Sequence, residues 1–297
     1  MRIAVVIPVR NDAQRLADCL VALERQTRPA DEIVVVDNGS TDGSAAVAAA
    51  HGARVVPARV AGIPGATATG FDHARGDVVA RLDADSVPAA DWLERIEAAF
   101  AADPSLAAVS GAATFYGGTP IVRFLGRLSL TLGYFRLIAG VIGHAPLYGS
   151  NFAVRTEVWR RMRGAVHRDR ADVHDDLDIS LQLPAGAEVR YDPGLEVAVS
   201  SRSFLRPGGT RRQIGMTART FLVTGRERGL LRLRLTWFLA DQERAAQREP
   251  ELWRLGALER GAAEHIWGRW ARRSPASRSG RVASPPEPEQ LDAGSHR

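Results

Sequence analysis

Short apolar runs alternate with amphipathic segments over roughly the first two hundred residues. The runs Ile3–Val9, Glu32–Asp37 and 78–82 are almost wholly apolar, which is typical of strands buried on both faces. Between residues 12 and 26 apolar side chains recur at helical spacing, which predicts an amphipathic helix. Strands that alternate with helices at these lengths predict right-handed βαβ units, and therefore an α/β fold with a mostly parallel sheet.

The same pattern predicts the remaining elements of this sheet domain. Asp91 and Glu94 have the spacing of a capping box at the start of a helix. Ligands of open α/β sheets bind beyond the carboxyl ends of the strands, so we expect the site there. Further strands are predicted at 54–57, 106–111, 147–154, 188–191 and 195–199, and helices at 44–51, 64–74, 91–102 and 156–162.

Changes in composition divide the chain. Residues 1–205 form the predicted sheet domain, with a first half, 1–110, and a second half, 111–205. After residue 206 the alternation ends, and a helical extension is predicted for 206–271. Residues 272–297 are rich in Ser, Pro, Arg and Gly, which predicts a disordered tail. The extension carries four tryptophans, Trp237, Trp253, Trp267 and Trp270.

The most hydrophobic segment is 120–143, but three arginines interrupt it. The uninterrupted part, 137–143, is far shorter than the roughly 20 residues that span a bilayer. We therefore expect either a helix that covers the sheet or an amphipathic segment at a membrane interface. The apolar run at the amino end is too short for a secretion signal, which predicts a cytoplasmic protein, at most bound peripherally to the inner face of the membrane.

Charge and cysteine content change this picture little. The net charge is +5 and the pI about 10.2, and all 39 basic residues are arginine. We read the arginine bias as genome composition and expect no nucleic-acid partner. Basic residues crowd the last third, which suits anionic lipid or acidic partners. The single cysteine, Cys19, excludes an internal disulfide and a cysteine zinc site, and its helical position predicts a small buried hydrophobe.

Two carboxylates, Asp83 and Asp85, directly follow a predicted strand. Residues i and i+2 of an extended chain point to the same side, so both can face one ligand. Mg²⁺ and Mn²⁺ prefer hard oxygen ligands, and Mg²⁺ commonly takes one or two carboxylates together with substrate phosphates. The pattern indicates a metal–diphosphate site. The alternative is a solvated turn with an Asp cap.

Other nucleotide-binding patterns are missing from the first turn. Dinucleotide sites need Gly-x-Gly-x-x-Gly after the first strand, whereas Pro8-Val9-Arg10-Asn11-Asp12 has no glycine, and no Walker loop is present. A phosphate held without a glycine cradle needs a metal or arginines. Four polar positions then need a common explanation: Asp37, the Asp83–Asp85 pair, Asn151 and the cluster at Asp175 and Asp176.

Five segments in order resemble family 2 inverting glycosyltransferases of the GT-A fold. The resemblance covers about residues 1–205 and lies in Val6 to Asn11, Glu32 to Ser44, Gly76 to Asp85, Gly149 to Arg155 and His174 to Ile179. It implies a nucleotide-diphosphate sugar as donor and a hydroxyl acceptor, either lipid-linked or a glycan.

The resemblance also implies a role for each matching residue. The backbone of Pro8, Val9 and Arg10 and the side chain of Asp37 would hold the nucleotide base, and Asp83 the ribose or donor sugar. Asp85 would bind Mg²⁺ or Mn²⁺. Asn151 lies on the acceptor side. Asp176 would take the proton from the acceptor hydroxyl, with Asp175 beside it.

The chain departs from the family pattern at a few positions. Thr67-Ala68 stands where relatives often carry an Arg-Asn pair, which leaves Arg59, Arg81 or Arg202 as candidates for the diphosphate contact. Ser200-Ser201-Arg202 stands where some relatives have a metal-binding histidine. The alternatives are a nucleotidyltransferase, which would want a glycine-rich loop after the first strand, and a non-catalytic membrane-peripheral scaffold of the same fold.

Overall fold

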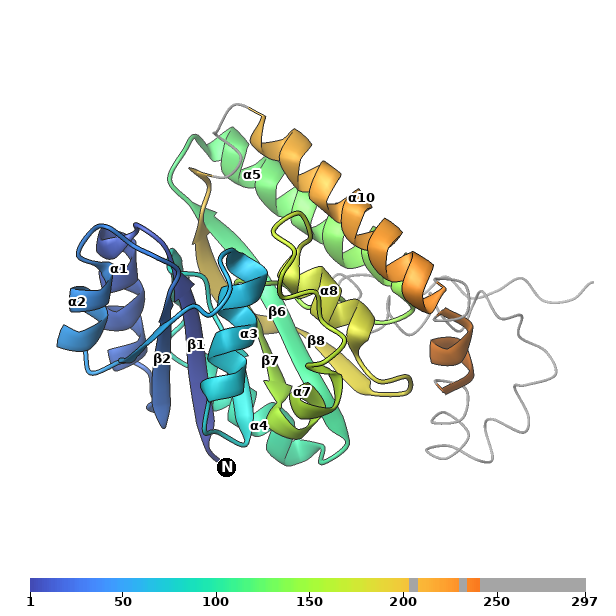
Figure 1. The fold of residues 1–297 in the computed structure, drawn as a ribbon, viewed down its shortest axis with the longest axis horizontal. Helices are drawn as coiled ribbons and strands as arrows, with labels where there is room; N and C mark the ends of the chain where they lie inside the picture. Colours follow the sequence, from blue (N-terminus) through green and yellow to red (C-terminus); the bar gives the residue numbers. More distant parts are fainter. Residues whose placement is uncertain (203–207, 230–233, 241–297) are drawn as a thin grey trace, which may run out of the picture.

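The computed structural model describes residues 1–202, 208–229 and 234–240. Eight strands within these ranges form one sheet in the order β3-β2-β1-β4-β7-β6-β8-β5, with helices on both faces (Figure 1). The strands are β1 Ile3–Val9, β2 Glu32–Asp37, β3 Arg54–Pro57, β4 Val78–Arg81, β5 Ser86–Pro88, β6 Leu106–Tyr116, β7 Phe152–Arg155 and β8 Glu188–Ser200. The helices are α1 Ala13–Glu24, α2 Ser44–Ala50, α3 Ile63–His73, α4 Trp92–Ala102, α5 Pro120–Leu128, η1 Ser129–Ile138, α6 Ala139–Ile142, α7 Thr156–Met162, α8 Asp175–Gln182 and α10 Gly209–Arg228.

The sheet is parallel in its first half and mixed in its second. β3, β2, β1 and β4 are parallel neighbours, which confirms the predicted βαβ units. β7 then inserts antiparallel between β4 and β6, and β5 pairs antiparallel with β8 at the edge. The α/β class is therefore confirmed, and the mostly parallel arrangement holds for the half that contains β1 and β4.

Apolar side chains fill both faces of the sheet. On one face Leu16 and Leu20 of α1 and Trp92 of α4 pack against the strands. On the other, Phe71 of α3 and Trp159 of α7 meet edge to face, with ring centroids 5.0 Å apart. Cys19 is fully buried, as expected of a small hydrophobe.

Long-range pairing moves several predicted boundaries. The expected strands at 188–191 and 195–199 are one strand, β8, because both parts pair with an extended β6, and a register shift between Gly111 and Ala112 absorbs the turn-like residues between them. β5 was not predicted, and within 147–154 the strand is confined to its last residues. Asp91 does stand before α4, but its side chain makes no capping hydrogen bond. It pairs with Arg95 instead, so the capping box is wrong.

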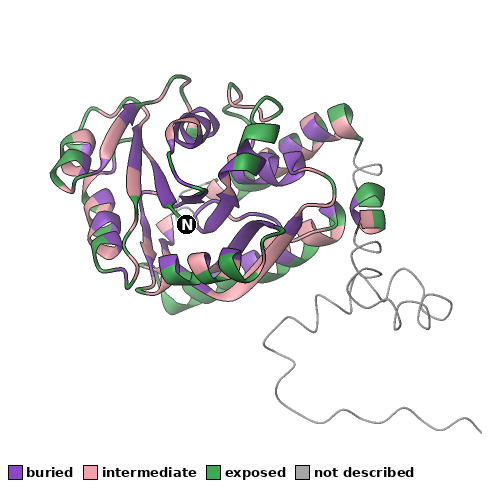
Figure 2. Ribbon diagram, turned by 90° about the horizontal axis from the view of Figure 1, so that it is seen from below, coloured by how far each residue is buried: buried purple, intermediate pink, exposed green. Residues whose placement is uncertain are grey.

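The helix that follows β6 is a continuous one of 23 residues, from α5 through η1 to α6. By length and composition it is long and apolar enough to cross a membrane, so the expectation that no segment reaches that length is wrong. One side, with Leu130, Phe135 and Ile142, is buried. The other side is exposed and still apolar; Ile121 is 71% and Phe124 65% accessible. Figure 2 shows the same contrast across the molecule, with the sheet largely buried and exposed residues along the outer sides of the helices.

The described part of the carboxyl-terminal region is helical. Residues 234–240 form a helical segment whose Trp237 is buried, with its ring centroid 4.1 Å from that of His144. Trp237 thus packs against the sheet domain. Trp253, Trp267, Trp270 and the predicted tail 272–297 lie outside the described residues.

Candidate active site

The predicted site residues gather at the carboxyl edge of the parallel strands. Pro8 and Val9 end β1, Asp37 ends β2, and Asp83 and Asp85 follow β4. Asp175 and Asp176 begin α8, which lies over the same edge, where α3 contacts it. The topology therefore brings together segments that lie far apart in the sequence.

A buried arginine joins the two acidic motifs. Arg81, the last residue of β4, places Nη2 2.9 Å from Asp83 Oδ1 and 3.0 Å from Asp175 Oδ2. Burial by itself lowers the pKa of Arg81, but the charges of Asp175 and Asp83 outweigh it and raise that pKa, so the guanidinium stays charged. Thr67 Oγ1 donates to Asp175 at 2.7 Å. Asp83 and Asp175 are thus held as parts of one network.

Asp176 is the more buried of the two acids at the start of α8. Gly149 N donates to its Oδ2 at 2.8 Å, and Leu177 N donates to its Oδ1 at 2.7 Å. Burial and, next, the neighbouring charge of Asp175 raise the pKa of Asp176 above the usual value. A carboxylate with a raised pKa and fixed orientation is suited to accept a proton.

Asp85 belongs to a second charged cluster. Arg202, two residues beyond β8, places Nε 2.9 Å from Asp85 Oδ2, and its Nη2 contacts Asp12 Oδ2. Arg15 Nη1 lies 2.9 Å from the other oxygen of Asp12. Burial, then the charge of Asp83, raise the pKa of Asp85 to about 6, while Arg202 opposes the shift.

The turns after β1 and β2 are bonded to each other. Asp37 Oδ1 accepts from Ser40 N at 2.9 Å, which orders the turn after β2. Asn11 has a positive φ of 52°, a conformation that asparagine tolerates, and its Oδ1 accepts from Thr41 N at 2.7 Å. Arg10 is exposed beside this turn. The backbone of β1 and Asp37 therefore share one rigid edge.

Asn151 has a different position from the other candidates. It lies directly before β7 and is fully buried. Its Oδ1 accepts a hydrogen bond from Trp92 Nε1 at 2.8 Å, and its Nδ2 donates to the carbonyls of Ala112 and Leu195. Its amide is committed to joining β6, β8 and α4. The neighbours of Asn151 in this segment contact the candidate acids, because Gly149 N donates to Asp176 and Ser150 Oγ donates to Asp83.

The carboxylate oxygens at this edge can hold a hard divalent cation only if a substrate supplies further oxygen ligands. Within residues 1–202 and the two later described stretches, no group of three His, Cys, Asp or Glu side chains is placed to hold a metal ion. Asp85 still supplies a carboxylate at the right edge, and phosphate and water oxygens commonly complete Mg²⁺ coordination. The residues therefore fit Mg²⁺ or Mn²⁺ bound through a diphosphate.

Sequence reasoning missed two parts of this constellation. The sequence pattern places Asp12 at the start of a helix, and nothing in its spacing signals the contact with Arg202. Arg81 was considered only as a phosphate ligand, although a charged residue inside an otherwise apolar strand is a signal of a buried ion pair. Arg59, the third candidate arginine, is exposed.

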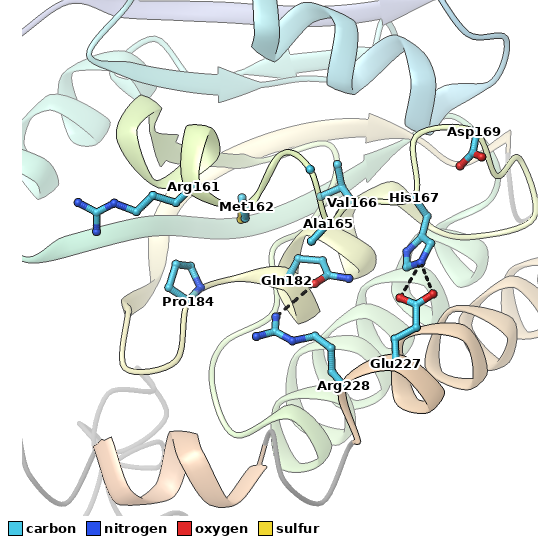
Figure 3. Close-up of a pocket in the computed structure, with 11 residues that line it drawn as sticks. Arg161, Met162, Ala165, Val166, His167, Asp169, Gln182, Pro184, Glu227 and Arg228 are labelled. Atoms are coloured by element: carbon cyan, nitrogen blue, oxygen red, sulfur yellow. Dashed lines mark hydrogen bonds and ion pairs between the residues drawn. The ribbon is translucent and has the colours of Figure 1, made fainter.

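A cavity of about 720 Å³ lies at the opposite end of α8, near Gln182 and Pro184 (Figure 3). None of the acids described above lines it. Its notable feature is His167, whose Nε2 lies 3.0 Å from Glu227 Oε2 (Figure 3). The Nδ1 of the same ring lies 2.8 Å from Asp178 Oδ1. This histidine joins α8 to α10.

Comparison with known families gives a match over the first half of the chain. The model of the family described as Glycosyl transferase family 2 matches residues 4–161, which is more than half of the 297 residues.

Curated relatives match over shorter stretches. Glycosyltransferase AglE of Haloferax volcanii is 36% identical over 101 residues, which are 31% of this chain and 33% of that protein. The undecaprenyl-phosphate 4-deoxy-4-formamido-L-arabinose transferase of Sodalis glossinidius is 40% identical over 94 residues, which are 28% and 29% of the two chains. The chain thus spans about a third of the length of these relatives.

Solved structures share the fold. The mannosyltransferase PcManGT of Pyrobaculum calidifontis, solved with GDP-Man and Mn²⁺, superposes with a TM-score of 0.51 at 21% identity, over 91% of this chain and 80% of that one. Glucosyl-3-phosphoglycerate synthase of Mycobacterium tuberculosis gives a TM-score of 0.50 at 21% identity, over 75% and 78%. At this identity the likeness concerns the fold.

Proposed function

The chain belongs to glycosyl transferase family 2, and from this premise we propose that it is an inverting enzyme, which moves one sugar from a nucleotide-diphosphate donor to a hydroxyl acceptor. The observation that carries the proposal is the contact of Arg81 with both Asp83 and Asp175. This contact brings the donor motif and the base motif into one network. A single-displacement reaction needs such proximity, because donor and acceptor must meet in one site.

The donor lies along the edge formed by β1, β2 and β4 in this proposal. The backbone of Pro8, Val9 and Arg10 and the carboxylate of Asp37 hold the nucleotide base. Asp83 accepts hydrogen bonds from the ribose or the sugar and is itself oriented by Arg81 and Ser150. Asp85 faces the diphosphate. A divalent cation bound there would offset the negative charge that grows on the leaving diphosphate.

Asp176 is the base. It takes the proton of the acceptor hydroxyl as that oxygen bonds to the anomeric carbon, and the bond from this carbon to the diphosphate breaks on the opposite face. The configuration at the anomeric carbon is thereby inverted. Asp175 is held by Arg81 and Thr67 and positions the start of α8, and its charge supports the raised pKa of Asp176.

The acceptor is a lipid-linked hydroxyl compound presented at the cytoplasmic face of a membrane. The exposed side of α5 is apolar, and its charged residues are Arg123 and Arg127. The sequence contains no acidic residue between Asp103 and Glu157. Exposed apolar side chains and cations without acids suit a bilayer with anionic headgroups. One of the relatives is named as an undecaprenyl-phosphate 4-deoxy-4-formamido-L-arabinose transferase, which supports an acceptor carried on a lipid.

The same helix connects to the base. Tyr134 Oη, on η1, donates to the carbonyl of Leu147 at 2.6 Å, and Ser180 Oγ of α8 accepts from Leu147 N at 2.8 Å. Gly149, two residues on, donates to Asp176. A bilayer against α5 and η1 would thus lie beside the segment that holds the base.

A donor screen tests the proposal. The full chain is incubated with a panel of UDP-, GDP- and dTDP-sugars and Mn²⁺, with and without a polyprenyl-linked sugar, which offers free hydroxyl groups, in detergent, and nucleotide release is measured. Release of nucleoside diphosphate from at least one sugar is expected, with faster release when an acceptor is present. No release from any donor would contradict the proposal and favour a non-catalytic scaffold, and release of pyrophosphate from a nucleoside triphosphate and a sugar phosphate would favour a nucleotidyltransferase.

A further inference from the structure

Arg202 pairs with Asp85, the carboxylate proposed to bind a divalent cation. Its guanidinium lies between two carboxylates, with Nε 2.9 Å from Asp85 Oδ2 and Nη2 in contact with Asp12 Oδ2. The arginine follows Ser201 at the end of β8, and about a third of its side chain is exposed. A planar guanidinium that serves two carboxylates at once is a well-matched counter-ion for both.

The other acids nearby have arginines of their own. Arg81 pairs with Asp83, and Arg15 pairs with the second oxygen of Asp12. Of the three arginines Arg15, Arg81 and Arg202, it is Arg202 that pairs with Asp85. Asp85 itself is buried, and a buried carboxylate without a counter-charge is costly. If Arg202 leaves, another cation has to take its place.

We propose that Arg202 is a built-in counter-ion, which a divalent cation must displace from Asp85 when the donor binds. The free protein then binds Mg²⁺ or Mn²⁺ weakly, because the cation competes with a guanidinium. The donor's diphosphate changes this balance, since it gives the released guanidinium a new anionic partner and gives the cation further oxygen ligands. Cation and donor bind cooperatively as a result.

This inference rests on the proposed function for the identity of the diphosphate, but the competition at Asp85 does not require sugar transfer. It is measured with the metal alone. Mn²⁺ is titrated into the full chain without nucleotide, and free Mn²⁺ is followed by its electron paramagnetic resonance signal. Arg202→Ala is expected to bind Mn²⁺ about tenfold or more tightly than the unaltered protein, within the range of about 5- to 150-fold that couplings between sites commonly reach.

Three further variants make the result specific. Arg202→Gln keeps most of the side chain without its charge, and it should bind Mn²⁺ as Arg202→Ala does, which guards against misfolding of the smaller variant. Arg15→Ala removes the other arginine on Asp12 without touching Asp85 and should leave the affinity unchanged. Adding Asp85→Asn to Arg202→Ala should abolish the gain, because it removes the carboxylate for which the two cations compete.

Equal or weaker Mn²⁺ binding by both Arg202 variants, relative to the unaltered protein, would overturn the inference, as would a gain of the same size in Arg15→Ala. The outcome is separate from that of the donor screen. A protein that transfers no sugar can still show the competition, and an active one can lack it.

Discussion

Arg81 Nη2 lies 3.0 Å from Asp175 Oδ2, and this contact fastens the end of β4 to the start of α8. The same nitrogen lies 2.9 Å from Asp83 Oδ1. Both carboxylates belong to motifs that sequence reasoning assigned to different substrates. Their common partner holds the turn after β4 and the start of α8 at a fixed distance from each other.

Arg81→Ala should destabilise the fold strongly. Removing one partner of a buried ion pair leaves charge without compensation and typically costs about 3–5 kcal/mol. Urea unfolding followed by circular dichroism measures the loss. Arg95→Ala is the matched control, because it breaks the exposed pair with Asp91, and such pairs contribute about 1 kcal/mol or less. Similar losses for the two variants would contradict the structural role of Arg81.

Local pattern was sufficient for the parallel half of the fold. The strands β1, β2 and β3 have the predicted bounds, because each is a short apolar run closed by polar or turn-forming residues. The insertion of β7 between β4 and β6 could not be predicted, since it depends on pairing between distant segments. The continuity of β8 depends likewise on its long partner β6.

The acidic residues of the candidate site could be predicted from the sequence, but the arginines that pair with them could not. Asp83, Asp85, Asp175 and Asp176 stand out in the sequence because acids follow apolar runs. Which arginine meets which acid is decided by the tertiary fold, and Asp12 shows this most clearly. Asn151 lies in a segment with a family motif, and the structure shows that its amide makes three buried hydrogen bonds, none of which the motif predicts.

Asn151→Ala separates structural from acceptor-binding roles. The change leaves Trp92 Nε1 and the carbonyls of Ala112 and Leu195 without their partner, and each unsatisfied buried group costs about 1–3 kcal/mol. We expect a lower free energy of unfolding and little change in nucleotide affinity at a temperature where the variant is folded. Unchanged stability combined with a raised acceptor KM would show instead that Asn151 contacts the acceptor.

His167 should make stability depend on pH. Burial lowers the pKa of His167, but hydrogen bonds and charges from Asp178 and Glu227 outweigh it, so its pKa in the folded state lies above the unfolded value of about 6.5. This contribution is complete below about pH 6.5 and is lost as pH rises through the folded-state pKa. Urea unfolding of the unaltered protein and of His167→Gln at about pH 6 and about pH 9 measures it. The stability difference between the two proteins should shrink at the higher pH, and a difference that stays constant or grows would refute the assignment.

The exposed side of α5 should bind anionic bilayers. Co-sedimentation with vesicles of phosphatidylglycerol and phosphatidylcholine is expected at low salt, and it should weaken as salt rises, because exposed charges are screened over about 10 Å at 0.1 M. The double change Ile121→Ser and Phe124→Ser should reduce binding about tenfold or more, since a buried apolar side chain contributes about 1.5–3 kcal/mol.

The control for this experiment is Ile63→Ser, which removes an apolar side chain of α3 that is also more than half exposed. It should bind vesicles as the unaltered protein does. Protein that stays wholly in the supernatant at low salt would favour a soluble acceptor and leave the 120–142 helix as a cover of the sheet.

The turnover of Asp176→Asn tests the central claim most directly. The amide keeps the shape of the carboxylate but cannot take the acceptor's proton, so we predict an unchanged donor affinity and a kcat about 10²–10⁴-fold lower, which is the usual contribution of a positioned base. The measurement is steady-state sugar transfer with the donor found in the screen, together with calorimetric donor binding and the anomeric configuration of the product by NMR. A kcat within a few fold of the unaltered protein, or a product that retains the donor's configuration, would contradict inverting transfer with Asp176 as the base.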